Sequence, residues 1–301
     1  MRAPMRALAF SLAVLFLAGP SFAQPDYEIK LARPGKKGDR YRIEASGEQL
    51  RQVALRSGGQ TIPGSSEGFK VELAGEATVL EADAQGNVTR AQVRVSTLAR
   101  VVGLRRDEML DAGTLVTESR AGARQRFQID GRDTTPLIKD LLEVVLSETS
   151  DPNAPSDDEL MGTRERKKVG ERWTVDRERL AGFLSQDKDI NLDVKPSDVE
   201  GGGTLTAIER IDGLECLRVD VAFRFTGTPR VGPGAPPGAA ASIGVTISSL
   251  LPVDTARDAL AESAQLSMTY TIDAMRREGR PPEQLVATWT QRNSRKLRPI
   301  R

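Results

Sequence analysis

The carboxylates are the residues of this chain best suited to chemistry, because the sequence contains no histidine. Without histidine, Ser-His-Asp and Cys-His catalysis, histidine general bases and the common zinc sites are excluded. A pair of carboxylates serves some hydrolases as acid and base. Acids occupy matching places in the two halves of the chain, namely Asp39, Glu171, Glu81 and Glu209. A carboxylate-dependent hydrolase is therefore the alternative function, although turn and strand-end contacts shared by duplicated modules explain the same recurrence.

Short matches to nucleophile motifs lack the context that their chemistry needs. The Gly-x-Ser-x-Gly match at 64–68 has no histidine to take the proton, and we expect a flexible loop there. Ser185 and Lys188 match Ser-x-x-Lys, but the acids around Lys188 would keep its amine protonated. Cys216 is the only cysteine and lies in an alternating strand pattern, which favours a buried structural thiol. We predict no catalytic residue.

Oxygen-bearing side chains at alternate positions, with an acid at the twelfth, follow part of the calcium-loop pattern; they are Asp187, Asp189, Asn191, Asp193 and Asp198. Leu192 stands where the sharp turn of such a loop requires glycine. The apolar residues between the acids favour a half-buried strand with an acidic outer face. We therefore expect no metal site and no cofactor.

Three aromatic side chains are the candidate ligand-binding residues. Trp173, Trp289 and Tyr41 are large enough to line an apolar ligand site. Filling the hydrophobic core is the alternative role, since buried aromatics commonly do only that.

A stretch that the chain uses twice must position these residues. Residues 36–44 return at 168–176 with glycine, acid, arginine and aromatic in the same order. A Gly-x-x-Thr strand follows each copy, at 75–81 and at 203–209. This pattern predicts an internal duplication whose two copies occupy equivalent places in the fold.

Period-two alternation predicts most of the remaining elements as strands. The expected strands are 41–55, 69–81, 88–97, 124–129, 204–209, 217–225, 266–272 and 285–291. Thr135 and Pro136 are typical of a helix start, and an apolar stripe follows them. A short helix is expected at 177–184. The segment 256–263 fits helix or strand, and the duplication favours strand.

We predict a mainly β fold with two duplicated antiparallel modules, as curved sheets or half-barrels with one or two packing helices. The expected parts are a signal peptide (1–23), a first β module ending in a helix (24–149), an acidic linker (150–163), and a second β module (164–301) with a Gly/Pro-rich loop (227–241) and a basic tail. At a coarse level this arrangement is similar to half-barrel lipid carriers of the cell envelope.

The N-terminus is typical of an export signal. Arg2 and Arg6 precede an apolar run, and Ser21 to Ala23 fit a signal-peptidase site. The run is too short for a membrane anchor, so we expect a soluble periplasmic or extracellular protein. The mature chain would carry 41 basic and 42 acidic residues, a balance that argues against nucleic-acid binding.

One pattern in the second half is similar to that of a known group of proteins. It is Lys-x-Gly-x-x-Trp-x-Val at 168–175, followed by a helix and a Gly-x-x-Thr hairpin. It resembles exported bacterial β-rich proteins of the domain-of-unknown-function type, and the resemblance implies no catalytic residue. We expect a non-enzymatic binding or scaffold protein for an apolar or lipid ligand or an envelope partner.

Overall fold

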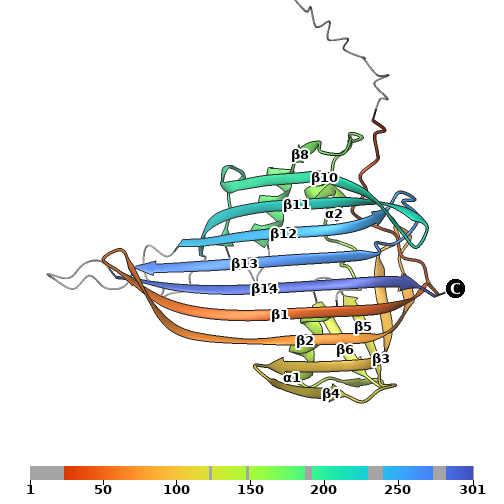
Figure 1. Ribbon diagram of the computed structural model, residues 1–301, viewed down its shortest axis with the longest axis horizontal. Helices are drawn as coiled ribbons and strands as arrows, with labels where there is room; N and C mark the ends of the chain where they lie inside the picture. The colour runs from red at the N-terminus through yellow and green to blue at the C-terminus, as the bar shows by residue number, and fades with distance from the viewer. Residues whose placement is uncertain are drawn as a thin grey trace, which may run out of the picture.

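The chain forms one large, curved and unclosed antiparallel sheet with helices on one face, here called the inner face, as the computed structural model shows (Figure 1). The structure describes residues 24–121, 124–146, 149–186, 192–229, 240–273 and 283–300. The expected signal peptide lies outside these residues. Strands account for 62% and helices for 12%, which confirms the mainly β prediction.

The first half of the chain supplies half of the sheet and one helix. Its elements are β1 (Arg40–Ser57), β2 (Gln60–Ala82), β3 (Val88–Val102), β4 (Arg105–Leu110), β5 (Leu115–Ala121), β6 (Arg124–Ile129), β7 (Arg132–Asp133) and α1 (Pro136–Val145). The helix begins as its sequence predicts, because the Thr135 hydroxyl accepts a hydrogen bond from the Ile138 amide.

The second half adds the other strands and two helices. Its elements are α2 (Asp157–Met161), β8 (Arg172–Thr174), α3 (Arg177–Gln186), β9 (Leu192–Asp193), the 3₁₀ turn η1 (Pro196–Asp198), β10 (Val199–Ile211), β11 (Leu214–Pro229), β12 (Ala240–Pro252), β13 (Ala261–Asp273) and β14 (Glu283–Pro299). Asp176 starts α3 by accepting a hydrogen bond from the Arg179 amide at 3.0 Å.

Two meanders meet at the centre of the sheet. The strand order is β7-β6-β5-β3-β2-β1-β14-β13-β12-β11-β10-β8, so that each half contributes consecutive neighbours. The junction is the pairing of β1 with β14, which runs from Tyr41 opposite Pro299 to Ser57 opposite Glu283. The two halves therefore share one sheet, a point that the sequence left open.

The inner face nevertheless carries two separate hydrophobic clusters, one built mainly by each half of the chain. The first cluster lies under α1, where Leu141 and Leu142 pack with Val71 and Leu73 of β2. Gly47 of β1 lets the helix approach, because a Cβ there would overlap Val144.

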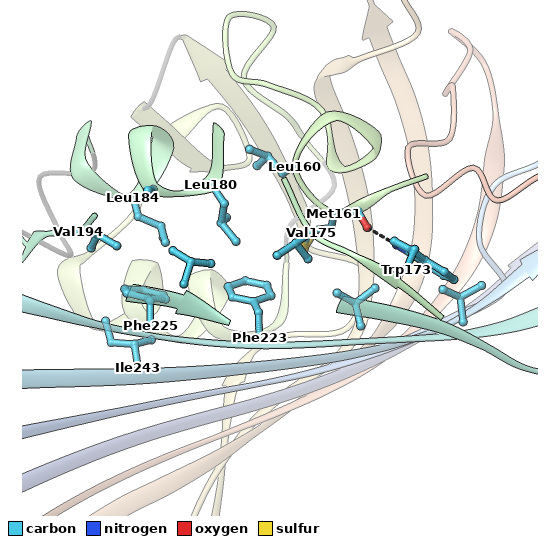
Figure 2. Close-up of a cluster of buried hydrophobic side chains, with 14 of the residues drawn as sticks. Leu160, Met161, Trp173, Val175, Leu180, Leu184, Val194, Phe223, Phe225 and Ile243 are labelled. Carbon is cyan, nitrogen blue, oxygen red and sulfur yellow. Dashed lines mark hydrogen bonds between the residues drawn. The ribbon is translucent and has the colours of Figure 1, made fainter. Parts of the chain in front are cut away.

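In the second cluster α3 covers β11, and Figure 2 shows Leu180 and Leu184 above Phe223 and Phe225. The expected inward face of 217–225 is confirmed, since its alternate apolar residues are buried in this cluster.

The repeated stretch forms the same turn in both halves. Gly38 and Gly170 adopt φ of 92° and 89°, conformations that favour glycine. The side chains of Asp39 and Glu171 accept hydrogen bonds from the Lys36 and Lys168 amides at 2.7 and 2.9 Å.

The strands that follow these turns differ in place. β1 has 18 residues at the centre of the sheet, whereas β8 has three residues at its edge. Tyr41 lies opposite Ala77, and Trp173 lies opposite Gly203. The turns are equivalent but the strands are not, and the duplication itself stays a prediction.

Three segments that we expected to be irregular include strands or a helix. Residues 64–68, expected as a loop, lie in β2, where a Cβ on Gly64 or Gly68 would meet a β1 carbonyl, so these glycines permit close pairing. The basic tail continues β14 to Pro299, because Leu297 enters the first cluster. The acidic linker contains α2, whose Ser156–Glu159 capping box precedes two buried residues.

Other boundaries also differ from expectation. The strand β12 was not predicted, because its alternating apolar residues are interrupted at Ser249 and follow a Gly/Pro-rich stretch. Most of that stretch, 230–239, lies outside the described residues. In the ambiguous segment 256–263 the strand β13 begins at Ala261, after a turn.

Candidate functional site

A cavity of about 910 Å³ lies between the two hydrophobic clusters on the inner face. Tyr41, Val79 and Leu297 of the first cluster line it. Side chains of the second cluster line it as well, among them Leu160, Met161, Leu180, Leu184, Phe223 and Leu251. These parts of the walls are apolar, and both halves of the chain are needed to build them.

Charged side chains also line the cavity, and three of them lie close together. Glu262 and Arg295 line the cavity from the facing strands β13 and β14. They form an ion pair of 3.1 Å, with 33% and 22% of the two side chains exposed. Asp157, the first residue of α2, lines the same cavity.

Asp157 is an exposed residue that lines the cavity, although nearby protein groups partly desolvate its carboxylate. Burial raises the pKa of Asp157 above its ordinary value, and the negative charges of Glu262 and Asp158 raise it further. Arg295 opposes this shift without cancelling it. The cavity thus holds a carboxylate that is destabilised in its charged form.

The segment before β1 closes one side of the cavity through polar contacts. The Asp158 carboxylate accepts a hydrogen bond from the Leu31 amide at 2.6 Å. Arg33 donates to the carbonyl oxygens of Pro252 at 3.0 Å and Asp254 at 3.2 Å. Burial lowers the pKa of Arg33 and raises that of Asp158. Asp158 and Arg33 therefore hold the segment before β1 in place as one wall of the cavity.

A buried carboxylate fastens the opposite wall. Glu118 is 1% exposed, and one of its oxygens accepts hydrogen bonds from the amide and hydroxyl of Thr149 at 3.1 and 2.7 Å. The Gln125 side chain donates to the same oxygen at 2.7 Å. The contact holds the start of the acidic linker against β5, where Thr149, Ser150 and Asp151 line the cavity.

The structure places the three candidate aromatics apart. Tyr41 lines the cavity. Trp173 is 9% exposed in the second cluster and donates from Nε1 to the Met161 carbonyl at 2.7 Å, a contact drawn in Figure 2. Trp289 lies half-buried farther along β14, opposite Met268, and outside the cavity lining. Their role in ligand binding stays a prediction.

The four candidate carboxylates do not gather in the cavity. Only Asp39 lines it. Glu81 and Glu209 pair with arginines of the neighbouring strands, Arg90 at 3.3 Å and Arg218 at 2.5 Å. The Arg218 guanidinium lowers the pKa of Glu209. Sequence reasoning missed Asp157 and Glu262, because no local motif marks either residue.

The remaining candidate motifs have structural contacts where the structure describes them. Ser185 Oγ exchanges hydrogen bonds with the backbone of Val194 at 3.2 Å, and Lys188 lies outside the described residues. Cys216 is buried, and burial raises its thiol pKa. Leu192 and Val194 are buried with Asp193 exposed between them, as expected for a strand, while 187–191 are not described. Among the helices of the described residues, none has the length and apolar character to cross a lipid bilayer.

Comparison with protein-family models and with curated proteins finds no match. Among solved structures, a DUF1329 family protein from Desulfovibrio piger is similar at 12% identity over 84% of each chain, with a TM-score of 0.12. MucB in complex with MucA(peri) is similar at 10% identity over 82% of this chain and 87% of that chain, with a TM-score of 0.16. At TM-scores this low, the likenesses carry no argument about fold or function.

Proposed function

We propose that this protein is an exported, non-enzymatic binding protein that holds an apolar or lipid-like ligand in the inner-face cavity. The observation that carries the proposal is the cavity itself. Its volume of about 910 Å³ falls within the range of small-molecule sites, roughly 300–1,000 Å³. Apolar atoms form the larger part of its walls, as in such sites, together with a number of charged and polar side chains.

The position of the cavity also supports a binding role. It lies where two separately packed clusters meet, and neither cluster fills it. Tight packing is the rule inside proteins, so a space of this size between ordered walls needs an explanation. An apolar ligand would complete the packing between the clusters. The export signal read from residues 1–23 is consistent with an envelope or extracellular ligand.

The binding test uses Nile red, an uncharged dye whose fluorescence rises in apolar surroundings. Ile247→Trp places a larger side chain on the cavity wall, and Ser248→Trp places the same side chain on the outer face of β12. We expect Ile247→Trp to weaken dye binding at least about tenfold, with Ser248→Trp close to the unmodified protein. Loss of a tenfold affinity corresponds to about 1.4 kcal/mol. Equal binding by both variants would place the dye elsewhere and reject the cavity as the site.

The natural ligand is then sought by native mass spectrometry of the protein purified from its own cells. A co-purifying small molecule that Ile247→Trp loses and Ser248→Trp keeps would identify the ligand. A co-purifying protein subunit, with no small molecule in either variant, would favour the scaffold role.

A carboxylate-dependent hydrolase is the second candidate, now with different residues. Asp157, with its raised pKa, and Glu262 line the same cavity, and two such acids are the minimal set for glycosidic hydrolysis. Glu262 is held in an ion pair with Arg295 and is therefore less available as a catalytic acid or base, which favours the binding role. Turnover of nitrophenyl glycosides that is lost in Asp157→Asn would establish the hydrolase, and absence of turnover would reject it.

A further inference from the structure

We propose that the ligand is an amphiphile whose apolar chain fills the cavity and whose polar end is a carboxylate bound by Arg120. This inference rests on the function proposed above and names the class of ligand. It is carried by the place of Arg120 on the cavity wall and by the lack of an acceptor for its side chain among the described residues.

Arg120 lies near the end of β5 and lines the cavity. Its Nε atom is shielded from solvent and has no hydrogen-bond partner among the described residues. A buried donor without an acceptor is unfavourable, because it loses its hydration and gains no hydrogen bond in exchange. A ligand that brings acceptor oxygens to this wall would supply what the arginine lacks.

The nearest acid along the strand is used for another contact. Glu118 lies two residues before Arg120, and one of its oxygens accepts hydrogen bonds from the Thr149 hydroxyl and the Gln125 amide, both at 2.7 Å. Glu118 therefore holds the start of the acidic linker against β5, and both of these contacts are made to residues other than Arg120.

The other arginines of the lining have acceptors. Arg33 donates to the carbonyl oxygens of Pro252 and Asp254. Three more form ion pairs, at 3.6, 3.1 and 3.1 Å, which are Arg40 with Glu76, Arg257 with Asp254, and Arg295 with Glu262. Arg120 is therefore the arginine of the lining that is available to a ligand.

The lining carries as many arginines as acidic residues, so net charge does not select the ligand. The preference comes from local hydrogen bonding. Asp157 also lacks a donor among the described residues, but it is exposed, so water can hydrate its carboxylate, whereas Nε of Arg120 is closed to water. Arginine presents Nε and a terminal nitrogen as a planar fork that matches the two oxygens of a carboxylate, and its long stem lets the fork turn toward a ligand.

The test compares three compounds that share one chain and differ in the charge of the polar end. Dodecanoate, dodecanol and dodecylamine compete with Nile red at pH 8, each below its micelle-forming concentration. At this pH the carboxylate is ionised and the amine is protonated, since such groups titrate at about 4.3 and about 10.4. We expect dodecanoate to bind about 10- to 100-fold more tightly than dodecanol, the range for a hydrogen bond to a charged group. Acetate, which lacks the chain, should not displace the dye.

Arg120→Gln should remove the preference for dodecanoate and leave dodecanol binding unchanged, which also shows that the cavity is intact. Arg124→Gln, at an exposed position of β6, makes the same charge change as a control and should keep the preference. A preference that persists in Arg120→Gln would place the carboxylate elsewhere and overturn the inference. Equal loss of dodecanol and dodecanoate binding in Arg120→Gln would give the arginine a structural role and overturn it as well.

The comparison in the unmodified protein does not depend on any variant. If dodecanol binds but dodecanoate has no advantage, the inference falls and the binding function stands. Tighter binding of dodecylamine than of dodecanoate, or displacement of the dye by acetate, also overturns the inference. If none of the chain compounds displaces the dye, the proposed function falls with it.

Discussion

Gly203 and Trp173 offer a sharp test of how the second cluster is built. The two residues face each other on β10 and β8, and Gly203 is buried. A Cβ at Gly203 would overlap the indole, lying 2.0 Å from Cζ2 and 2.7 Å from Nε1 of Trp173. Gly203→Ala must therefore displace a ring that donates to the Met161 carbonyl at 2.7 Å.

The expected cost combines two destabilising terms and one stabilising term. Overpacking a core position costs about 1–3 kcal/mol, and loss of a hydrogen bond adds about 0.5–1.5 kcal/mol. Replacing glycine restricts the unfolded chain, which returns about 0.4–1 kcal/mol. We therefore expect Gly203→Ala to lower the free energy of unfolding by about 0.5–4 kcal/mol. Since Met161 lines the cavity, dye binding should weaken as well.

The assay is urea unfolding followed by circular dichroism, with tryptophan emission as a second signal. Gly244→Ala is the matched control, because it lies in β12 of the same sheet and a Cβ there would meet nothing within 4 Å. It should be neutral or slightly stabilising. In a Trp173→Phe background, which lacks the outer indole atoms, Gly203→Ala should cost less, with a coupling of about 0.5–3 kcal/mol. An undiminished cost in that background, or no cost in the unmodified protein, would refute the assigned contact.

Two further predictions concern the seam of the sheet and the charged cavity wall. Leu297→Ala should destabilise the protein by about 2–5 kcal/mol, because Leu297 is only 4% exposed. The control Lys296→Ala, at the adjacent exposed position, should change the free energy of unfolding by no more than about 0.5 kcal/mol. Equal effects of the two substitutions in urea unfolding would contradict the packing of the C-terminal strand. Asp157→Asn should stabilise the protein at pH 7, because the raised pKa means that folding disfavours the ionised carboxylate. This advantage should shrink as the pH falls through the raised pKa and vanish below the ordinary carboxyl pKa of about 3.9; an advantage that grows on acidification would contradict the assignment.

Local patterns predicted the elements whose two faces differ clearly. The alternation in 217–225 predicted the inner face of β11, and the Thr135–Pro136 signal predicted the start of α1. Both signals act within a few residues, so they can be read without knowing the partner. The C-terminal strand shows the limit, because its basic residues suggested a solvated tail while its pairing with β1 and β13 keeps it in the sheet.

The candidate site was harder to predict than the fold. Sequence reasoning chose carboxylates that recur in both halves, and those residues serve turns and strand-end ion pairs. Asp157 lay in a segment expected to be a solvated linker, and Glu262 in one that fitted helix or strand. Neither residue has a local signature, because its importance comes from neighbours distant in the chain.

The sequence by itself determined a mainly β chain without histidine chemistry, with strand faces and helix starts set by period, capping and turn residues. Only the tertiary structure decided that β1 pairs with β14, that the two halves share one sheet, and that a cavity separates their clusters. The physical reason is the range of the interactions. Periodicity and capping act over a few residues, whereas strand pairing and the meeting of Asp157 with Glu262 and Arg295 join residues about a hundred or more positions apart.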